Sequence, residues 1–523
     1  MPIERLVFST FQGEYGMYMA QGFEKCVRIE DITFIPQITA QEARSMKDWI
    51  DAISCEVWRK IVNDEKAEKT SSILQIIIVE NAYLRNREEN KGDEPPWTEE
   101  LPGVLRRHLR QSHALIETED PSQIVPTFPL TGTGCIFHRG GLTEQLLTLF
   151  DGWRLREIRQ LGFLAGVMVR MEREETESRM LFSHTRLVHT LSVVGIAVLI
   201  GANSGLSEED MRVLEAAAVL HDITTPAGGD TTKMAVGEEL DEEETCVPLI
   251  WQHAARLQLL NISAERVIDT IQGQGILGEI LNLADRFAYV GGDAVAYCSC
   301  QNVSVGYDHS IEHMISTTPC VCGCWDSVQV IEDKAVVTDV SRFEHFLRLR
   351  ARLIKSVYAN PTTRTLEHFL ATLVIKWLWD RKVFTKESLL ANSDSFVTDK
   401  INEALNGHWI DAGILAECPK SEVEWFESEG EARGREAELQ KEGVLLTHIE
   451  EISSYNPGTN ALVLWEGEIR EFQEVQPEAH EEISLETGQG GWLLHWCRTK
   501  YLPELMQSSE YMTWREESRQ RDS

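Results

Sequence analysis

The feature that most constrains this chain is a set of apolar segments that carry ionisable side chains at their ends. The run HTRLVHTLSVVGIAVLI contains His189, and the run LEAAAVLHD ends in His221 and Asp222. Apolar runs of this kind predict buried helices, where polar groups are costly unless they are neutralised or ligated. Asp285 ends a third run, ILGEILNLAD. The alternative is a few unrelated core polar residues, but two imidazoles and two carboxylates together suit a divalent metal.

Four short motifs around these residues occur in a fixed order, RLREIRQLG, SHTRLVHTLSV, LHD and ADRFAYVGGD. In this order they resemble the HD-domain superfamily. Within it they resemble the deoxynucleoside triphosphate triphosphohydrolases, the branch of bacterial dGTPases and SAM-and-HD-domain dNTPases. The His…His-Asp…Asp set indicates only the superfamily. The RQLG stretch, the Arg three residues before His189 and the Asp-Arg-x-x-Tyr-x-x-x-Asp run indicate the branch. The resemblance covers roughly residues 142–372.

Length and composition describe a soluble globular protein of two or three domains. The chain has 523 residues, of which 42% are hydrophobic and 26% charged. The longest apolar run, residues 191–200, is too short to span a bilayer. Residues 1–15 lack the features of a signal peptide. We therefore expect a cytoplasmic protein without a membrane partner, whose 11 cysteines are thiols or metal ligands.

The net charge of −34 argues against a strong nucleic-acid surface, because duplex binding depends on neutralising phosphates. An anionic substrate is still compatible with this charge if the pocket that holds it is locally basic. The motif region offers cations for such a pocket, namely Arg154, Arg156, Arg159, Arg186, Arg286 and Arg350.

The expected fold is mainly α, with an all-helical HD-domain core and accessory α+β regions at both ends. We predict an N-terminal accessory region (1–140), the HD phosphohydrolase domain (141–385) and a C-terminal α+β module (386–523) with an assembly or regulatory role. A cysteine-rich insertion occupies residues 296–340, and SVQVIEDKAVVTD within it predicts a hairpin. In the C-terminal module, HIEEISSYNPGTNALVLWEGEIREFQ predicts strands joined by a Pro-Gly turn.

The resemblance implies that His189, His221, Asp222 and Asp285 hold one transition metal, Mn, Fe or Zn. This ion would lower the pKa of a bound water. Mg²⁺ would arrive with the nucleotide. Arg186 lies one helical turn before His189 on the same face, so it is placed to stabilise phosphate charge.

The resemblance also assigns residues to the substrate. Asp285, Tyr289 and Asp293 are spaced by four residues and fall on one helix stripe, although Gly291 and Gly292 weaken the helix there. By the resemblance, contacts to phosphate, sugar and base come from Gln160, Leu161, Arg186, Arg286, Tyr289, Asp293, Arg350 and Tyr358. An ordinary core tyrosine and a helix-end cap are the alternatives for Tyr289 and Asp293.

The loop after Asp222 departs from the family pattern. In the family this loop carries additional histidines, whereas here Thr224, Thr225 and Asp230 occupy it. Without gaps, Asp230 stands at the position of the histidine that protonates the leaving oxygen. An aspartate can do this only with a raised pKa. If Asp230 is not the acid, Glu242 to Glu244 or water are the alternatives.

The cysteine-rich insertion leaves two interpretations open, a structural zinc site and free thiols. Zinc sites of thiolates usually contain CxxC, whereas the spacing here is CxC and CxCxC. The candidate ligands are Cys298, Cys300, Cys320, Cys322 and Cys324.

The function that the resemblance implies is hydrolysis of a dNTP to deoxynucleoside and inorganic triphosphate, with nucleotide depletion as an antiviral defence among its roles. It also implies a homo-oligomer with a nucleotide effector. Three alternatives stay open at this point. They are another HD phosphohydrolase acting on nucleoside monophosphates or an alarmone, a nucleotide-binding regulator that has lost catalysis, and a metal nuclease, which the acidic surface disfavours.

Overall fold

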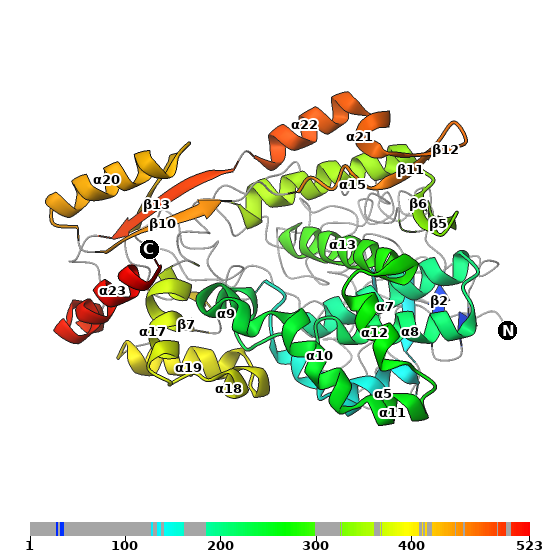
Figure 1. Cartoon of the computed structure of the whole chain (residues 1–523), viewed down its shortest axis with the longest axis horizontal. Helices are drawn as coiled ribbons and strands as arrows, with labels where there is room; N and C mark the ends of the chain where they lie inside the picture. The colour runs from blue at the N-terminus through cyan, green and yellow to red at the C-terminus, as the bar shows by residue number, and fades with distance from the viewer. Residues whose placement is uncertain are drawn as a thin grey trace, which may run out of the picture.

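The computed structural model describes residues 28–29, 32–35, 127–128, 133–137, 141–161, 185–298, 325, 327–359, 367, 369–406, 410–411, 414–415, 421–444, 446–452, 456–488, 490–497 and 504–522. Within these ranges helices predominate, which confirms the predicted mainly-α fold. Figure 1 shows the green helices of the central region gathered on one side of the C-terminal strands and helices. The predicted limits of the three domains stay a prediction.

Three helices form the centre of the fold, α7 (Arg186–Asn203), α8 (Glu208–Leu220) and α13 (Gly275–Cys298). α7 packs against both of the others. Its first turn is capped by Thr185, whose side chain accepts a hydrogen bond from the Val188 backbone N–H. By length and composition α7 is apolar enough to cross a membrane, but 89% of that stretch is buried inside the fold. Such burial is typical of the core helix of a globular protein.

Shorter helices surround this centre. They are α5 (Leu142–Leu149), η4 (Gly152–Glu157), α9 (Gly229–Val236), η5 (Glu238–Leu240), α10 (Glu242–Gln252), α11 (Ala254–Leu259), α12 (Ala264–Ile271) and α15 (Val340–Leu353), which continues as the π-helical turn η7 (Ile354–Tyr358). α5 and α12 pack on α8, and α15 packs on α13. The predicted helix stripe of Asp285, Tyr289 and Asp293 is confirmed, because α13 continues through Gly291 and Gly292 to Cys298.

The hairpin predicted after the cysteine-rich segment is present as β5 (Val328–Ile331) and β6 (Lys334–Val337). Its turn residues, Glu332 and Asp333, have φ of 51° and 56°, as a tight two-residue turn requires. β11 (Leu462–Trp465) pairs parallel to β6, and β12 (Glu468–Glu471) pairs antiparallel to β11. A C-terminal hairpin thus completes the sheet β12-β11-β6-β5.

The other described strands form three sheets, which are β1-β2-β4-β3, β10-β13-β9 and β7-β8. Their bounds are β1 (Arg28–Ile29), β2 (Ile32–Ile35), β3 (Thr127–Phe128), β4 (Thr133–Phe137), β7 (Ile410–Asp411), β8 (Ile414–Leu415), β9 (Ser421–Phe426), β10 (Leu446–Ile452) and β13 (Gly491–Cys497). The strands predicted on either side of Pro457 and Gly458 are present, but β10 and β11 lie in different sheets. The segment that contains Pro457 and Gly458 therefore connects two different sheets. It is not the turn of a hairpin.

The C-terminal part packs on the helical centre at two places. α21 (Phe472–Val475) and α22 (Pro477–Thr487) lie beside α15, where the rings of Phe472 and Phe343 meet edge to face with centroids 5.7 Å apart. A second hydrophobic cluster joins α9 to the C-terminal helix α23 (Ser509–Asp522) and to the helices before it. In it the Tyr511 hydroxyl donates a hydrogen bond of 2.6 Å to the carbonyl of Leu373.

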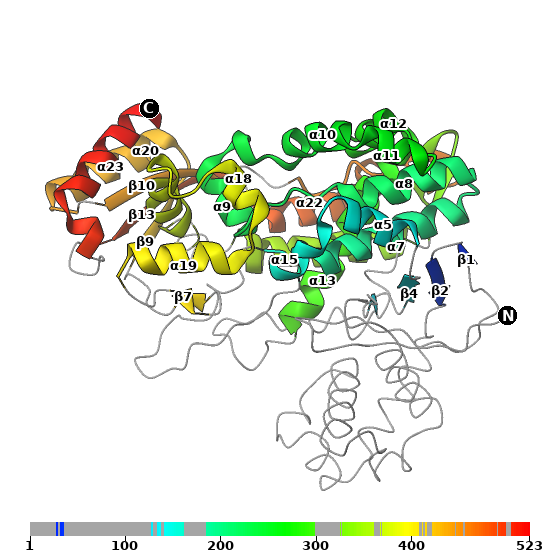
Figure 2. The same ribbon diagram turned by 90° about the horizontal axis from the view of Figure 1, so that it is seen from below.

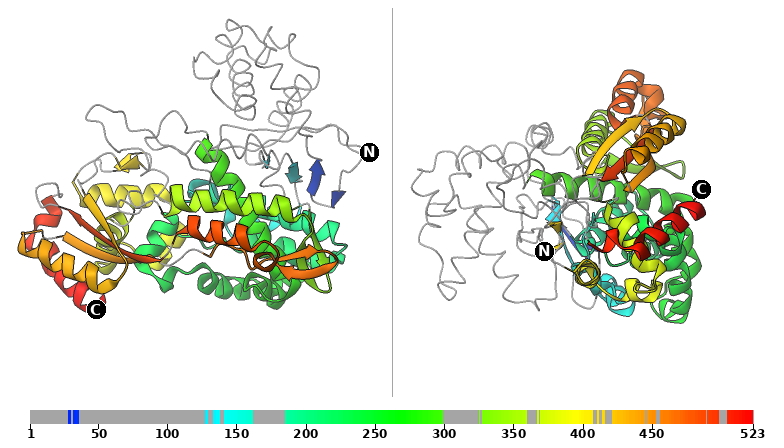
Figure 3. Two further views of the ribbon diagram at one scale, coloured as in Figure 1. Left: turned by 90° about the horizontal axis from the view of Figure 1, so that it is seen from above. Right: turned by 90° about the vertical axis from the view of Figure 1, so that its left-hand side faces the viewer.

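The remaining helices are η8 (Phe369–Ile375), α17 (Lys376–Asp380), α18 (Lys386–Ala391), α19 (Asp394–Ala404), α20 (Glu429–Lys441) and η10 (Glu504–Gln507). Figure 2 shows α20 and α23 with β10, β13 and β9 at one end of the molecule. Figure 3 confirms that this end lies opposite the N-terminal strands, drawn in blue. α9 packs on η8 and α17, and these three elements share a hydrophobic cluster with the C-terminal helix α23.

Candidate active site

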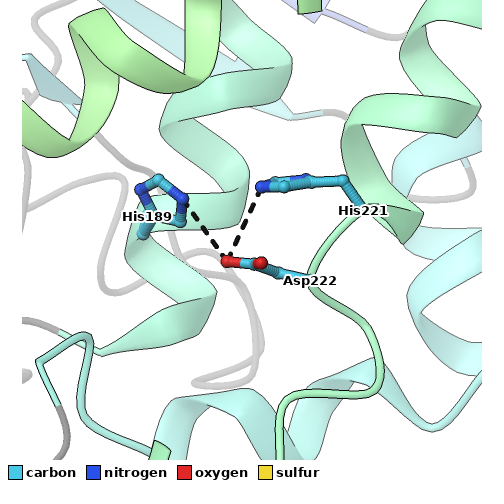
Figure 4. Close-up of side chains that lie close together, drawn as sticks. All are labelled: His189, His221 and Asp222. Carbon is cyan, nitrogen blue, oxygen red and sulfur yellow. Dashed lines mark ion pairs between the residues drawn. The ribbon is translucent and has the colours of Figure 1, made fainter. Parts of the chain in front are cut away.

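The four predicted metal ligands meet at the crossing of the three central helices. His189 comes from the first turn of α7, His221 and Asp222 directly follow α8, and Asp285 lies in the middle of α13. Nε2 of His189 is 3.0 Å from Oδ1 of Asp285 and 3.4 Å from Oδ2 of Asp222. Figure 4 shows both imidazoles directed at the Asp222 carboxylate. The apolar helices therefore bring together side chains that are almost a hundred residues apart in the sequence.

The orientation of His221 indicates a cation between these groups. Its Nδ1 lies 2.8 Å from the carbonyl oxygen of Ala218, which can only accept, so Nδ1 carries the proton. In the neutral ring the lone pair is then on Nε2, which is buried and has no hydrogen-bond partner among the residues that the structure describes. This atom faces Asp222 at 3.6 Å and Asp285 at 3.9 Å. A lone pair facing two carboxylates is unfavourable unless a cation lies between them.

The two carboxyl groups are ionised at neutral pH. Burial alone would raise the pKa of Asp222, but His221, Arg186 and His189 outweigh it when both rings are protonated and hold this pKa well below its usual range, and Arg186 acts in the same direction when the rings are neutral. Burial likewise opposes ionisation of Asp285, yet the hydrogen bond from His189 and the two imidazoles lower its pKa. Carboxylates and unprotonated imidazole nitrogens are the forms that bind metal.

The donor set fits a single divalent metal. Ligand atoms of His189, His221 and Asp222 all lie within 4.8 Å of one another, and Asp285 adds a fourth ligand atom, an oxygen, beside both imidazoles. Two nitrogens and two oxygens suit Mn, Fe or Zn, and the donor set does not select one of them.

Arg186 and Lys233 place positive charge next to the ligand cluster. Nη1 of Arg186 lies 2.9 Å from Oδ2 of Asp222, and its Nη2 lies 2.7 Å from Oδ1 of Asp230. Nζ of Lys233 lies 2.7 Å from the same Asp230 oxygen. Burial opposes ionisation of Asp230, but these two cations lower its pKa. A leaving-group acid needs a raised pKa, so the surroundings of Asp230 act against that predicted role.

A second pair of hydrogen bonds lies along α13, one and two turns beyond Asp285. Nε of Arg350 donates to the Tyr289 hydroxyl at 2.6 Å, and the Tyr358 hydroxyl donates to Oδ2 of Asp293. Asp293 is buried, and burial raises its pKa to about 7, although the bond from Tyr358 acts in the opposite direction. A carboxyl group that titrates near neutrality inside a cavity is typical of functional sites.

One cavity of about 430 Å³ connects the ligand cluster with these residues. Its lining is Gln160, Leu161, Arg186, His189, His221, Asp222, Asp230, Lys233, Met234, Asp285, Tyr289, Asp293, Arg350, Ile354, Tyr358 and Glu367. All the predicted catalytic, metal and substrate residues except Arg286 therefore line this one cavity. Arg286 does not line it, and its contact with phosphate stays a prediction.

The predicted basic pocket is smaller than the sequence suggested. Of the six arginines proposed for it, only Arg186 and Arg350 line the cavity. Nη2 of Arg154 donates to the carbonyls of Ile223 and Thr225 at 3.1 and 2.8 Å, and so fixes the loop after Asp222. Arg156 is half exposed and pairs with Glu157. Sequence position alone did not distinguish arginines that face the cavity from those that support it.

Two charged cavity residues were missed in the sequence. Lys233 follows Asp230 by three residues, so one helical turn of α9 places both at the cavity, and this spacing was a usable signal. Glu367 had no such signal. It is buried, and its Oε1 accepts a hydrogen bond of 3.0 Å from Thr231 on α9.

Asp394, at the start of α19, is a third residue that the sequence did not reveal. Its Oδ2 accepts from the Arg159 backbone N–H at 3.0 Å, and its Oδ1 accepts from the Gly228 backbone N–H at 2.8 Å. It thus joins the segment that ends in Gln160 and Leu161 to the glycine turn that precedes Asp230. We interpret Asp394 as a positioning residue, because it holds two cavity walls without lining the cavity.

The predicted zinc ligands cannot be placed in the same way. Cys298 is the last residue of α13, and Cys300, Cys320, Cys322 and Cys324 lie outside the described residues. The choice between a structural zinc and free thiols stays open.

Comparison with known proteins identifies an HD domain. Residues 186–289 match the HD domain family model, and this range contains all four ligands. A crystal structure of a hypothetical protein from Aquifex aeolicus is similar, with TM-score 0.50, 18% identity, and coverage of 72% of this chain and 97% of that one. A phosphohydrolase from Bacteroides thetaiotaomicron gives TM-score 0.51, 16% identity, and coverage of 72% and 99%. No curated protein matches the sequence. At these identities the likeness to the two structures shows a shared fold. The family match confirms the predicted HD domain for residues 186–289 but not the triphosphohydrolase branch.

Replacing Asp222 tests the ligand set. Asp222→Ala removes an oxygen ligand and leaves two imidazoles and one carboxylate, so we expect metal content to fall by at least about tenfold. Plasma mass spectrometry of purified protein measures this. Asp269→Ala changes an exposed carboxylate on α12 and serves as the control. Full metal occupancy in Asp222→Ala would show that the ligands are assigned wrongly.

The raised pKa of Asp293 predicts a pH dependence of stability in the metal-free protein. Between the ordinary value of 3.8 and about 7, the folded protein binds more protons than the unfolded chain. Stability therefore falls as pH rises through this window, and Asp293→Asn removes the dependence. We expect the Tm of the wild type to fall by roughly 5 °C relative to the variant between pH 4 and 7. Parallel Tm profiles of the two proteins would contradict the assigned pKa.

Proposed function

We propose that this HD-domain chain is a metal-dependent phosphohydrolase that cleaves a dNTP to deoxynucleoside and inorganic triphosphate. One observation carries the proposal. The metal-ligand cluster and the residues that the triphosphohydrolase resemblance assigns to sugar, base and phosphate line the same cavity. The alternative of another HD phosphohydrolase keeps the metal set but does not call for Arg350 and Tyr358, so the presence of these two residues in the same lining favours this branch.

The ligand end of the cavity suits the scissile phosphate. His189, His221, Asp222 and Asp285 would hold a divalent ion, which supplies Lewis-acid polarisation of a phosphoryl oxygen and of a water nucleophile. Arg186, which bridges Asp222 and Asp230, brings a fixed positive charge to this end. Phosphoryl transfer depends mostly on such positioning and charge stabilisation.

The lining residues outside the ligand cluster suit a deoxyribose. Oε1 of Gln160 is buried and has no hydrogen-bond partner in the described part of the chain, so it offers an acceptor to a hydroxyl donor. Tyr358 and Asp293, which also line the cavity, add a hydroxyl and a carboxyl. Leu161 is apolar and would pack against the sugar face, where a 2′-hydroxyl would be left without a partner. These features support recognition of a deoxynucleotide in preference to a ribonucleotide.

A second candidate is a nucleotide-binding regulator with weakened catalysis. The observation that favours it is the pairing of Asp230 with Arg186 and Lys233, which keeps this carboxyl ionised. Such a protein would bind the nucleotide and turn it over slowly, because Asp230, which stands at the position of the leaving-group acid of the resembled family, is ionised. A third reading, another HD phosphohydrolase, predicts pyrophosphate or orthophosphate as the product.

Three further features follow from the resemblance and stay predictions. They are assembly into a homo-oligomer with a nucleotide effector between subunits, Mg²⁺ bound with the substrate, and depletion of dNTPs as an antiviral defence. Light scattering of the protein with and without each dNTP measures the first of them.

The product of hydrolysis tests the proposal. Each dNTP and each NTP is incubated with the protein and Mn²⁺, and anions are separated by ion-exchange chromatography. We expect tripolyphosphate from at least one dNTP and much less from the matching NTP. Asp222→Ala should give none above background. Pyrophosphate or orthophosphate as the sole product would identify another hydrolase, and tight binding without product would identify the regulator.

Asp230→Asn decides whether Asp230 is the leaving-group acid. Because Asp230 is ionised between two cations, we expect the variant to keep its metal and to change turnover by less than about tenfold. The measurement is the rate of tripolyphosphate release at saturating substrate. A loss of roughly 10²-fold or more with metal retained would show that Asp230 donates the proton, as the resemblance implies. With turnover kept, the acid must be sought among Glu242 to Glu244 or water.

A further inference from the structure

A turn from the C-terminal part of the chain reaches the cavity arginine Arg350. The turn is Asn456-Pro457-Gly458, which connects the sheet of β10 with that of β11. Nη1 of Arg350 donates a hydrogen bond of 2.5 Å to the backbone carbonyl of Asn456. The turn lies more than a hundred residues beyond Arg350 and outside the motif region, so no sequence pattern connects the two.

The contacts of Arg350 leave one nitrogen for a ligand. Its Nε is occupied by the Tyr289 hydroxyl and its Nη1 by the Asn456 carbonyl. Among the described residues, none accepts a hydrogen bond from Nη2. Two bonds fix the plane of a guanidinium group, and Arg350 lines the cavity. The third nitrogen, Nη2, is therefore held in a fixed orientation and, among the described residues, has no acceptor that would compete with an anion.

The turn is shaped for this approach. Gly458 has φ +79°, and a Cβ there would lie 3.3 Å from Nη1 of Arg286 and 3.3 Å from Cδ2 of Leu347. The backbone N–H of Gly458 donates to Oδ1 of Asn456 at 2.7 Å, which closes the turn locally. A side chain at residue 458 would thus strain the backbone and press on the helices that carry the arginines.

The residue after the turn, Thr459, is also held in place by two helices of the C-terminal part. The Thr459 hydroxyl lies 2.8 Å from Nδ1 of His480 on α22, and the Thr459 carbonyl accepts from the Gln473 N–H on α21. α22 in turn pairs with α15 through Arg348–Glu482 and Arg352–Glu486, each at 2.8 Å. Arg350 lies between these two arginines on α15. The segment that holds the turn is thereby fixed to the helix that holds Arg350.

We propose that the Asn456–Gly458 turn is a positioning element of the site, which orients Arg350 so that its Nη2 faces the phosphate groups of the substrate. This inference rests on the proposed function for the identity of the substrate. It assigns the C-terminal part a role in anion binding that acts through Arg350, because the carbonyl of Asn456 is the partner of Nη1.

The test uses the full chain and inorganic tripolyphosphate as the probe, with Mg²⁺ in fixed excess, and measures binding by calorimetry. Gly458→Ala should weaken binding about tenfold, the effect of one lost charge-assisted hydrogen bond. Gly467→Ala is the matched control, because Gly467 also has positive φ, +86°, but a Cβ there meets nothing within 4 Å. Its binding should stay within about twofold of the wild type.

A double-mutant cycle separates positioning from general damage. Because the turn acts through Arg350, Gly458→Ala should add less than about twofold to the loss caused by Arg350→Ala. A full tenfold loss in the Arg350→Ala background would overturn the proposal, as would unchanged binding in Gly458→Ala or an equal loss in Gly467→Ala. If Gly458→Ala does not fold, Asn456→Ala replaces it in the same cycle, because it removes only the bond that closes the turn.

Binding and release of tripolyphosphate by the wild type distinguish failure of the role of the turn from failure of the proposed function. A wild type that binds tripolyphosphate but releases none from any dNTP refutes the triphosphohydrolase activity and leaves the role of the turn to be decided by the cycle. A wild type that binds no tripolyphosphate overturns the role of the turn as well, because Nη2 of Arg350 then receives no anion.

Discussion

The pair of carboxylates Asp222 and Asp285, the first buried and the second partly buried, is the constraint on which the rest of the structure depends. Removing two ionised groups from water is costly, and two imidazoles and Arg186 offset that cost only if all of them are held at fixed positions. The three apolar helices α7, α8 and α13 supply this rigidity, because their close packing leaves the side chains little freedom. The same packing directs the lone pair of His221 at both carboxylates, an arrangement that a divalent ion completes.

A second set of contacts, from segments remote in the chain, shapes the cavity around this centre. Asp394 joins the Gln160 segment to the turn before Asp230, and Arg154 fixes the loop between Asp222 and that turn. The Asn456 carbonyl holds Arg350 from the other side. Segments outside the HD domain therefore help to hold the residues that line the cavity, although the four metal ligands all come from the HD domain.

The sequence predicted what depends on local periodicity and failed where distant segments meet. Apolar runs predicted α7 and α8, and the four-residue spacing of Asp285, Tyr289 and Asp293 predicted their common face on α13. The positioning role of Asp394 could not be predicted from the sequence, because its hydrogen-bond partners lie 235 and 166 residues away. The ionised state of Asp230 likewise depends on Arg186, 44 residues before it, and on Lys233, so the loop sequence alone did not reveal it.

The most direct measurement of the central claim is a crystal structure of the protein with Mn²⁺ and a non-hydrolysable dNTP analogue, collected at a wavelength where manganese scatters anomalously. We expect one strong anomalous peak among Nε2 of His189, Nε2 of His221 and the carboxylates of Asp222 and Asp285. We also expect the phosphate groups to lie between this peak and Arg350, with the sugar beside Gln160 and Tyr358. An anomalous peak elsewhere, or an analogue bound outside this cavity, would contradict the account.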